Sequence, residues 1–371
     1  MEETQCAQAP KDSPVVDIDP DGDLLLKVGL LTCIPPEEPA KEPAQEPGKE
    51  PENEPENEQG EGQEGKEAEA SEDADKKHDH TLASPVWKKM LFGGFSESKR
   101  KSKRKDGDWI VKLPDDDVEA MEFFLDTIHA RFDRVPTFDH IPALEDLYQI
   151  AVVADKYDIN RFLRPWAKAW APHIKDNIEN RQGLEHYLWI SWVIGADEEF
   201  KRITHRLGME YKKMDEEEVR TLMPDILEPP GAMSLIKDIR LALIAEALSP
   251  LREAFHQLSH IGLEDRKLIR SLNRCSLWPI PDANDVVMSV NDLADILSNV
   301  GLKTERYVHF RDYSCQQVFA QPVTRQWFRD RVQVQLSDYQ KSQIEEHRKA
   351  TGLYRGDEEQ EPAKKKTKRS R

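Results

Sequence analysis

The sequence is poor in the features that mark secreted, membrane-spanning and metal-binding proteins. It has only four cysteines in 371 residues (Cys6, Cys33, Cys275 and Cys315), and none of them belongs to a CxxC pair. This argues against a disulfide framework and against a zinc module, and it fits a reducing compartment. The chain also has no apolar segment near its N-terminus and no long apolar run elsewhere. We therefore expect a soluble, intracellular protein that does not span a membrane.

Motifs of catalytic chemistry are missing as well. The chain has no GxxxxGK[ST], HExxH, GxSxG or GxGxxG pattern, so it offers no residue to assign to a reaction. We therefore expect no catalytic residue, no cofactor and no small-molecule substrate. His78 and His80 could chelate a metal, but two histidines in an acidic run lack a preorganised ligand shell, so no metal site is expected.

The charge of the chain is concentrated in one tract. The net charge is −18, and the residues from Glu37 to Asp75, with 16 acidic and 3 basic side chains, supply −13 of it. A Glu-Pro pair recurs every four residues, at Glu38, Glu42, Glu46, Glu50 and Glu54. Proline at this spacing excludes a helix and favours polyproline-like extension. We interpret the tract as a solvated, disordered spacer, with a dedicated binding tract as the alternative.

The sequence around this tract predicts short elements of a small domain. A strand is expected at Asp23–Val28, before the tract, and a short helix at Leu82–Leu91, after it, with Pro85 near the helix start. A second strand is expected at Trp109–Leu113. The acidic run Asp115–Asp117 is best explained as a cap for the helix that follows it.

Helical periodicity then continues along most of the chain. Pro165 should kink the third of these helices or mark its true start, and Pro250 should divide the long pattern in two. The last helix is expected to be exposed and rich in charge. The predicted helices cover Val118–Ile128, Leu144–Tyr157, Ile159–Ala171, Leu184–Gly195, Phe200–Leu207, Met233–Leu258, Asn291–Val300 and Phe328–Lys349.

Several of these segments, in this order, resemble the BTB/POZ domain in the version common among filamentous fungi. The matching segments are Asp21–Val28 (DGDLLLKV), Leu82–Trp87 (LASPVW), Val111–Asp117 (VKLPDDD) and Ala154–Ala167, which begins ADKYD and ends LRPWA. The helical region after them looks like the tail that often follows such domains, through Leu188–Trp192 (LWISW) and Leu277–Pro279 (LWP).

The resemblance implies an α+β fold, a short sheet flanked by a cluster of helices, that binds other proteins. It also implies self-association or a bridge to a scaffold such as a cullin-type ubiquitin ligase. The sequence departs from the family between its opening strand and the LASPVW helix, where the acidic tract replaces a strand and a helix. The hairpin partner of the opening strand is then either missing or supplied by Leu30–Ile34.

These observations define the expected domain organisation. Residues 1–16 are expected to be disordered, and 17–175 to form the BTB/POZ-like domain, interrupted by the disordered acidic Glu-Pro-rich insert at 35–81. A mainly α-helical region is expected at 180–350, and a disordered basic tail at 355–371.

Phe95 and Glu97 are the candidate partner-binding residues. Family members that engage cullin scaffolds often carry an apolar-x-Glu pattern at this point, so the resemblance implies that Phe95 fills an apolar pocket and that Glu97 accepts hydrogen bonds. The alternative is an aromatic residue at a helix end followed by a solvated acid.

Two basic clusters are further candidates. Lys364, Lys365, Lys366, Lys368 and Arg369 resemble a nuclear import signal, and the alternative is a solvating basic end. Lys99–Lys105 is a second such cluster, or a counter-charge for the acidic insert. Neither contains interleaved aromatic residues, so no direct nucleic-acid binding is expected.

The sequence thus favours a non-enzymatic protein-interaction protein in the nucleus or the cytoplasm, with the nucleus favoured. A substrate adaptor of a cullin-type ubiquitin ligase and a nuclear transcription-related cofactor are the alternatives. The expected partners are proteins, through self-association or a cullin scaffold, and not membranes, nucleic acids or small molecules.

Overall fold

The described part of the protein is α+β, made mostly of helices with one small parallel sheet. This confirms the α+β class expected from the sequence. It folds as two compact units, Met1–Val118 and Glu119–Arg371. The computed structural model describes residues 16, 18, 24–29, 84–98, 109–213, 226–260, 266–305, 325–328 and 331–353. The residues predicted to be disordered, including the acidic insert and the basic tail, lie almost entirely outside these ranges.

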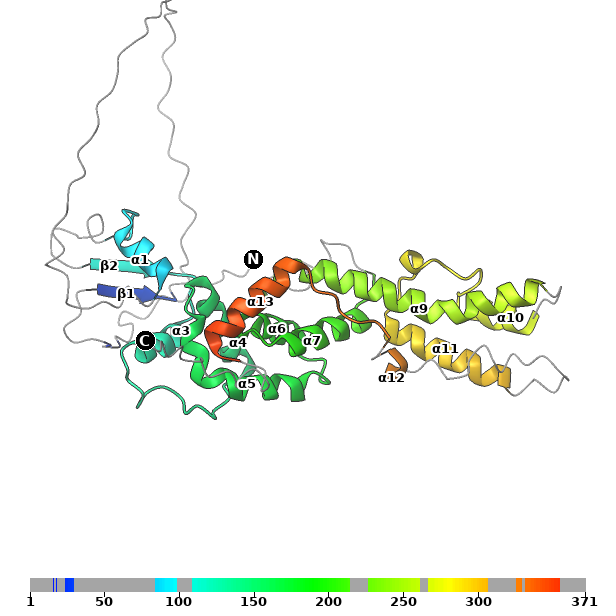
Figure 1. Ribbon diagram of the computed structural model, residues 1–371, viewed down its shortest axis with the longest axis horizontal. Helices are drawn as coiled ribbons and strands as arrows, with labels where there is room; N and C mark the ends of the chain where they lie inside the picture. Colours follow the sequence, from blue (N-terminus) through cyan, green and yellow to red (C-terminus); the bar gives the residue numbers. More distant parts are fainter. Residues whose placement is uncertain are drawn as a thin grey trace, which may run out of the picture. The chain divides into compact units, whose positions relative to one another are not determined.

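The sheet of the first unit consists of β1 (Leu24–Val28) and β2 (Trp109–Leu113), which lie side by side and parallel (Figure 1). Both strands fall where the sequence predicts them. Alternate residues of β2 are buried, as expected for a strand that covers a core with one face. β1 therefore has β2 as a partner, while Leu30–Ile34, the predicted alternative, lie outside the described residues.

Helix α1 (Pro85–Phe92) belongs to the connection between the two parallel strands, which is necessarily long because parallel strands cannot be joined by a tight hairpin. Ser84 is its N-cap, and its hydroxyl oxygen accepts a hydrogen bond from the Trp87 backbone N–H at 3.1 Å. Pro85 stands in the first turn, where its missing N–H costs little. The predicted helix is confirmed, with Pro85 near its start, but it begins at Pro85 and not at Leu82.

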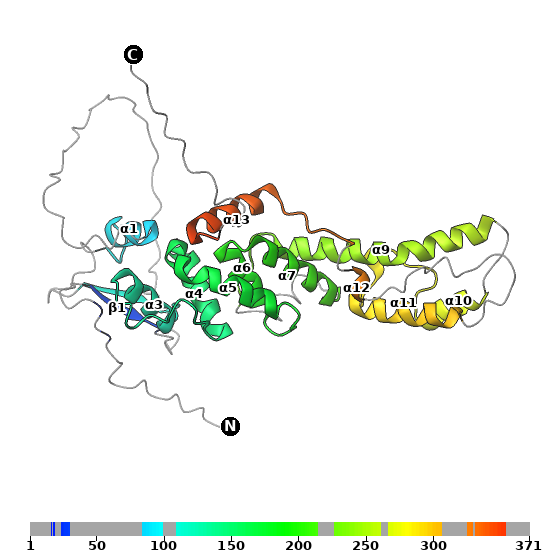
Figure 2. The same ribbon diagram turned by 60° about the horizontal axis from the view of Figure 1, so that its bottom comes forward.

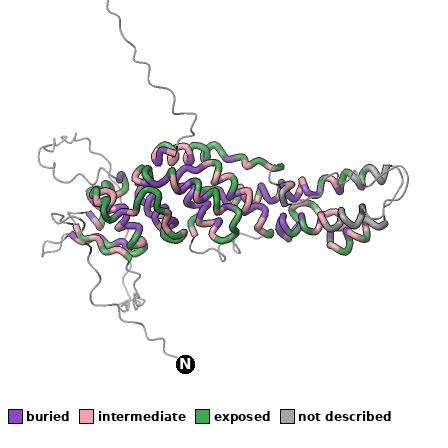
Figure 3. Tube along the Cα trace, turned by 90° about the horizontal axis from the view of Figure 1, so that it is seen from below, coloured by how far each residue is buried: buried purple, intermediate pink, exposed green. Residues whose placement is uncertain are grey.

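The second unit opens with a group of helices packed around tryptophans, which we call the first core. Trp166 and Trp170 are among the largest fully buried side chains, and the Trp166 indole N–H donates to the Pro136 carbonyl at 3.1 Å. Buried positions recur along these helices (Figure 3). The elements are α3 (Val118–Ile128), α4 (Leu144–Lys156), the 3₁₀ turn η2 (Asn160–Leu163), α5 (Arg164–Asn177), α6 (Leu184–Ile194) and α7 (Asp197–Glu210).

The structure divides the chain at another place than the predicted boundary between residues 175 and 180. α4 packs against α6, and α5 packs against both α6 and α7, so helices on the two sides of residue 175 share one unit. The division at Val118 therefore differs from the expected boundary between residues 175 and 180. Pro165 lies in the first turn of α5, which agrees with the second of the two roles predicted for it.

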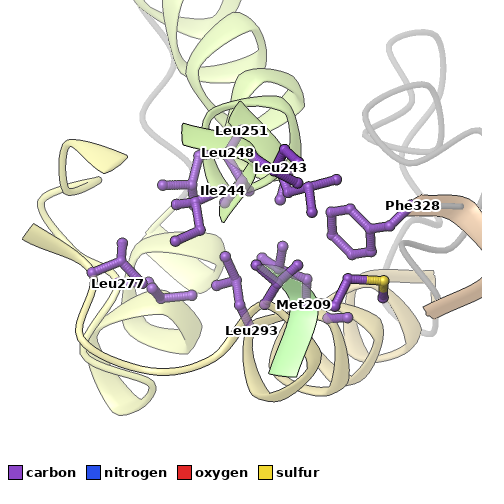
Figure 4. Close-up of a cluster of buried hydrophobic side chains, with 14 of the residues drawn as sticks. Met209, Leu243, Ile244, Leu248, Leu251, Leu277, Leu293 and Phe328 are labelled. Carbon is purple, nitrogen blue, oxygen red and sulfur yellow. The ribbon is translucent and has the colours of Figure 1, made fainter. Parts of the chain in front are cut away.

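The rest of the second unit is built on a second hydrophobic core. Met209, Leu248, Leu293 and Phe328 come from four different helices and point toward one another (Figure 4). The elements that form or flank this core are α9 (Ala232–His260), α10 (Arg266–Arg274), the 3₁₀ turn η3 (Ala283–Asp285), α11 (Val290–Glu305) and α12 (Arg325–Phe328).

The predicted break at Pro250 is wrong, because α9 continues through it as one helix. Proline removes the backbone donor that would reach the carbonyl four residues earlier. Ala247, Leu248 and Leu251, which surround it, are completely buried in the second core. Packing on both sides of the proline therefore holds the helix together. Helix α10 was not predicted from the sequence.

The predicted last helix is also corrected. Phe328–Lys349 is not one exposed helix: α12 ends at Phe328, the described residues 331–337 are not helical, and α13 (Asp338–Thr351) begins after the capping residue Ser337. Ile344 and Thr351 are buried. Figures 1 and 2 both show α13 lying across the green helices of the first core.

Polar contacts fasten α13 to residues more than 100 positions away. Gln340 donates to the Pro230 carbonyl at 3.0 Å, and the Thr351 hydroxyl donates to the Ile194 carbonyl at 2.7 Å. The His347 Nδ1 lies 2.9 Å from the Trp192 carbonyl oxygen, which can only accept, so Nδ1 carries the proton. The C-terminal helix is thus part of the first core. None of the helices in the described ranges is long and apolar enough to cross a membrane.

Candidate interaction site

The candidate site is the turn that follows α1, residues 92–98. The Gly93 N–H donates to the Lys89 carbonyl and ends the helix, and Gly94 adopts a left-handed conformation with φ +81°. The Ser98 N–H then donates to the Phe95 carbonyl at 3.1 Å and closes the turn. Gly94 adopts the left-handed conformation that glycine accepts readily, and Phe95 is exposed directly after it.

Two phenylalanines of this turn face outward. Phe92 is 52% exposed and Phe95 is 57% exposed, whereas Leu91, which precedes them, is buried. The Phe92 ring meets the Trp109 ring edge-on, with 6.0 Å between the centroids, so one side of Phe92 is held by β2. Exposed aromatic side chains on a well-held backbone are typical of protein-binding surfaces.

Glu97 contributes the charge of the site. The Ser96 hydroxyl and the Glu97 backbone N–H donate to its carboxylate and lower its pKa, so the side chain stays ionised at neutral and mildly acidic pH. Its main-chain carbonyl accepts a hydrogen bond from the Trp109 indole N–H at 2.9 Å. Because Trp109 lies in β2, this bond fixes the turn to the sheet.

Lys88 and Lys89, on α1, are exposed beside these residues in the sequence. We call the set Phe92, Phe95, Glu97, Lys88 and Lys89 the α1 surface. It combines apolar rings with charges of both signs and contains no nucleophile with an activating base. Such a set can bury its rings and pair its charges with another protein.

The structure brings the two predicted site residues, Phe95 and Glu97, into one turn. The sequence reasoning missed Phe92, although the signal for it exists. In a helix with Leu91 buried and Trp87 half-buried, position 92 falls outside the inward face, and an apolar residue there is exposed.

The other predicted sites lie outside the described residues. This holds for the import-like cluster (Lys364, Lys365, Lys366, Lys368 and Arg369), for Lys99–Lys105 and for His78 and His80. Within the described ranges, no group of three or more histidine, cysteine or acidic side chains is placed to hold a metal ion.

Two polar side chains of the second unit, Arg240 and Tyr211, make structural contacts. Arg240 is 5% exposed and donates to the carbonyls of Tyr211, Val286 and Met288, which joins three segments of the chain. The Tyr211 hydroxyl donates to the Glu185 carboxylate at 2.9 Å. These contacts hold main chain and helices together.

Comparison of the chain with protein-family models, curated proteins and solved structures found no match.

Proposed function

We propose that the protein is a non-enzymatic protein-interaction protein that acts through a BTB/POZ-like domain and binds its partner with the α1 surface. The observation that carries the proposal is the exposure of Phe92 and Phe95 on a turn held by Trp109. Two rings that are more than half exposed on an ordered turn are costly to leave in water and gain by docking into a partner.

The order of the elements supports the BTB/POZ-like part of the proposal. A strand, a helix and a second strand occur in this order, with the two strands paired, and helices follow. This agrees with the short sheet and the helix cluster that the resemblance implies.

A substrate adaptor of a cullin-type ubiquitin ligase is the second candidate, and one observation favours it. Phe95 and Glu97 are two residues apart in one turn, with the ring exposed and the carboxylate ionised. A scaffold could take the ring into an apolar pocket and donate hydrogen bonds to the carboxylate.

The test is capture of the full chain by a purified cullin N-terminal domain, alongside quantitative pull-down from cells. Phe95→Ala combined with Glu97→Ala should weaken partner binding by about 2 kcal/mol, roughly thirtyfold in Kd, if these are central contact residues. The matched control is Phe132→Ala with Asp133→Ala, since Phe132 is 59% exposed and also has an exposed acid beside it.

The outcomes separate the candidates. Cullin capture that the first variant loses and the control keeps supports the adaptor. Chromatin proteins that depend on Phe95 favour a nuclear cofactor. A set of bound proteins that is the same for both variants and the unchanged chain rejects the α1 surface as the binding site.

The nuclear location is proposed on the basic tail. Deleting residues 364–371 should lower nuclear accumulation in imaging, and unchanged accumulation would reject the tail as an import signal.

A further inference from the structure

The chain between α12 and α13 has the burial pattern of a strand. Residues 331–337 are not helical, and Figures 1 and 2 show them as an extended connection. The apolar side chains there are buried or partly buried, and these are Val332, Val334 and Leu336. The polar side chains between them, Gln333 and Gln335, are exposed. This period of two is that of a strand with one face on a core, and we call residues 332–336 the extended segment.

The main chain of the extended segment is unpaired among the residues that the structure describes. None of its N–H or carbonyl groups makes a hydrogen bond to another described residue. In a sheet, these groups bond to a neighbouring strand. Because Val332 and Val334 pack on the second core, the segment is already held in place and loses little conformational freedom when it pairs with another strand.

The sequence of the extended segment, VQVQL, lacks the residues that keep the edge of a strand from pairing. It contains no proline, no glycine and no charged residue, and its valines favour strands. Arg331, which precedes it, is already engaged. Its guanidinium lies 3.2 Å from the Glu246 carboxylate and 4.4 Å from the centroid of the Trp327 ring. An edge of this kind is a template for a second strand.

The order of residues in the extended segment favours a second copy of the same segment as its partner. Antiparallel pairing of two copies, centred on Val334, places Val332 opposite Leu336. It also places Gln333 opposite Gln335. Apolar side chains then meet apolar ones, amides meet amides, and no charge lies opposite a like charge. The two halves are related by a two-fold axis through Val334, which is the commonest symmetry of protein dimers.

We propose that the extended segment pairs with the same segment of a second copy of the chain, as an antiparallel two-stranded sheet that joins two chains. Pairing uses the main-chain edge of the segment, whereas packing uses its side-chain face, so each copy keeps its valines on its own second core. The contact lies in the second unit, and it goes beyond the proposed function, which uses the α1 surface. Because a pair of short strands buries little area, we expect a weak, concentration-dependent dimer.

Sedimentation equilibrium of the full chain, from about 1 to about 200 µM, measures the assembly. The expected result is a rise from the 42.8 kDa of one chain toward twice that mass as the concentration increases. Hydrogen exchange at the two ends of this series locates the contact. The amides of the extended segment should exchange rapidly in the monomer, because they have no acceptor there, and alternate ones should exchange more slowly in the dimer.

Charges placed at the two exposed glutamines test both the pairing and its direction. Gln333→Lys with Gln335→Lys sets lysine against lysine at both positions and should weaken the dimer by about tenfold or more. Gln333→Lys with Gln335→Glu sets lysine against glutamate in the antiparallel dimer, so its affinity should stay within about threefold of that of the unchanged chain. In a parallel dimer of the same register, this second variant would set like charges against each other and would be weakened.

The matched control is Asn180→Lys with Gln182→Lys. These are also two exposed amides two residues apart, and they lie between α5 and α6. The control adds the same charge to the chain, so a general effect of charge would weaken its dimer equally. We expect it to dimerise like the unchanged chain. Circular dichroism checks that all variants keep their helices.

Three results would overturn the proposal. The first is a chain that stays monomeric over the whole series; if a different protein then slows exchange of the same amides, the edge serves another partner. The second is a dimer that Gln333→Lys with Gln335→Lys weakens no more than the control does, or one without slowed exchange in the extended segment, which would place the contact elsewhere. The third is equal weakening by both glutamine variants, which would reject the antiparallel pairing.

Discussion

The hydroxyl of Thr351 donates a hydrogen bond to the main-chain carbonyl of Ile194 at 2.7 Å, across 157 positions of sequence. Thr351 is completely buried, and it is the last residue of α13. The bond therefore attaches the end of the last described helix to the end of α6.

Thr351→Val should test the strength of this attachment. Valine keeps the shape and removes the donor, so a buried carbonyl loses a partner, and the free energy of unfolding should fall by about 1–3 kcal/mol. Urea denaturation measures the change. The control is Thr204→Val: Thr204 is equally buried but donates within its own helix, to Phe200, so its loss should be smaller. Equal losses would contradict the special role of Thr351.

Gly195 provides the second prediction. Its φ is +75°, and a Cβ at this position would overlap the main chain of Arg348 in α13. Gly195→Ala should cost about 1–2 kcal/mol for the left-handed backbone, and further stability for the collision. Hydrogen exchange should show α13 opening more readily than in the unchanged protein.

Gly231→Ala is the control for this prediction. Gly231 has nearly the same φ, +72°, but a Cβ there would make only an ordinary contact at 3.5 Å. If both substitutions expose α13 equally, the close approach of Gly195 to Arg348 is not what holds the helix.

Arg240 provides the third prediction. Its guanidinium donates to three main-chain carbonyls, and Arg240→Met leaves all three without this donor. We expect a loss of about 3–5 kcal/mol in the free energy of unfolding, measured by chemical denaturation. Arg252→Met is the control, because Arg252 also donates to a carbonyl, that of Pro281, but from an exposed position. A loss no greater than that of the control would show that the Arg240 contacts contribute little.

Tyr211 should make the free energy of unfolding fall at alkaline pH. Burial, and then the neighbouring Glu185 carboxylate, raise the pKa of the Tyr211 hydroxyl well above its usual value of about 10. The unfolded chain loses this proton above about pH 10, while the folded chain keeps it. The stabilisation is therefore complete below about pH 10 and is lost above it, by up to about 1.4 kcal/mol per pH unit.

Tyr211→Phe should lower stability at neutral pH, because it removes the hydrogen bond to Glu185, and should flatten the fall above about pH 10. Thermal or urea unfolding from about pH 8 to about pH 11 measures both effects. Tyr339→Phe is the control, since Tyr339 is 57% exposed. A profile of Tyr211→Phe that is parallel to that of the unchanged protein would contradict the assignment.

Local patterns predicted most of the elements, because each depends on nearby residues. The strand at Trp109–Leu113 shows the expected alternation, and α1 begins at its serine cap and proline. Phe95 and Glu97 were chosen through the family resemblance, and they lie in one turn after α1. For such elements the sequence carries the physical cause within a few residues.

The wrong predictions concern helices whose structure depends on packing against residues far away in the sequence. Pro250 should end a helix by local rules, but the buried residues around it keep α9 whole. The inward face of α13 carries only one large aliphatic side chain, Ile344, and otherwise Gln340 and Thr351, so its pattern resembled that of an exposed helix. Its burial depends on carbonyl partners far away in the chain, and periodicity contains no information about them.

The position of α13 also sets an order of events during synthesis. Helix α7 ends at Glu210 and α13 ends at Thr351, so helices α4 to α7 are complete roughly 140 residues before α13 is. This corresponds to roughly 7–30 s at about 5–20 residues per second. Until then, the carbonyls of Trp192 and Ile194 lack the partners that His347 and Thr351 provide. The first core of the second unit can therefore reach its final form only after residue 351 has been translated.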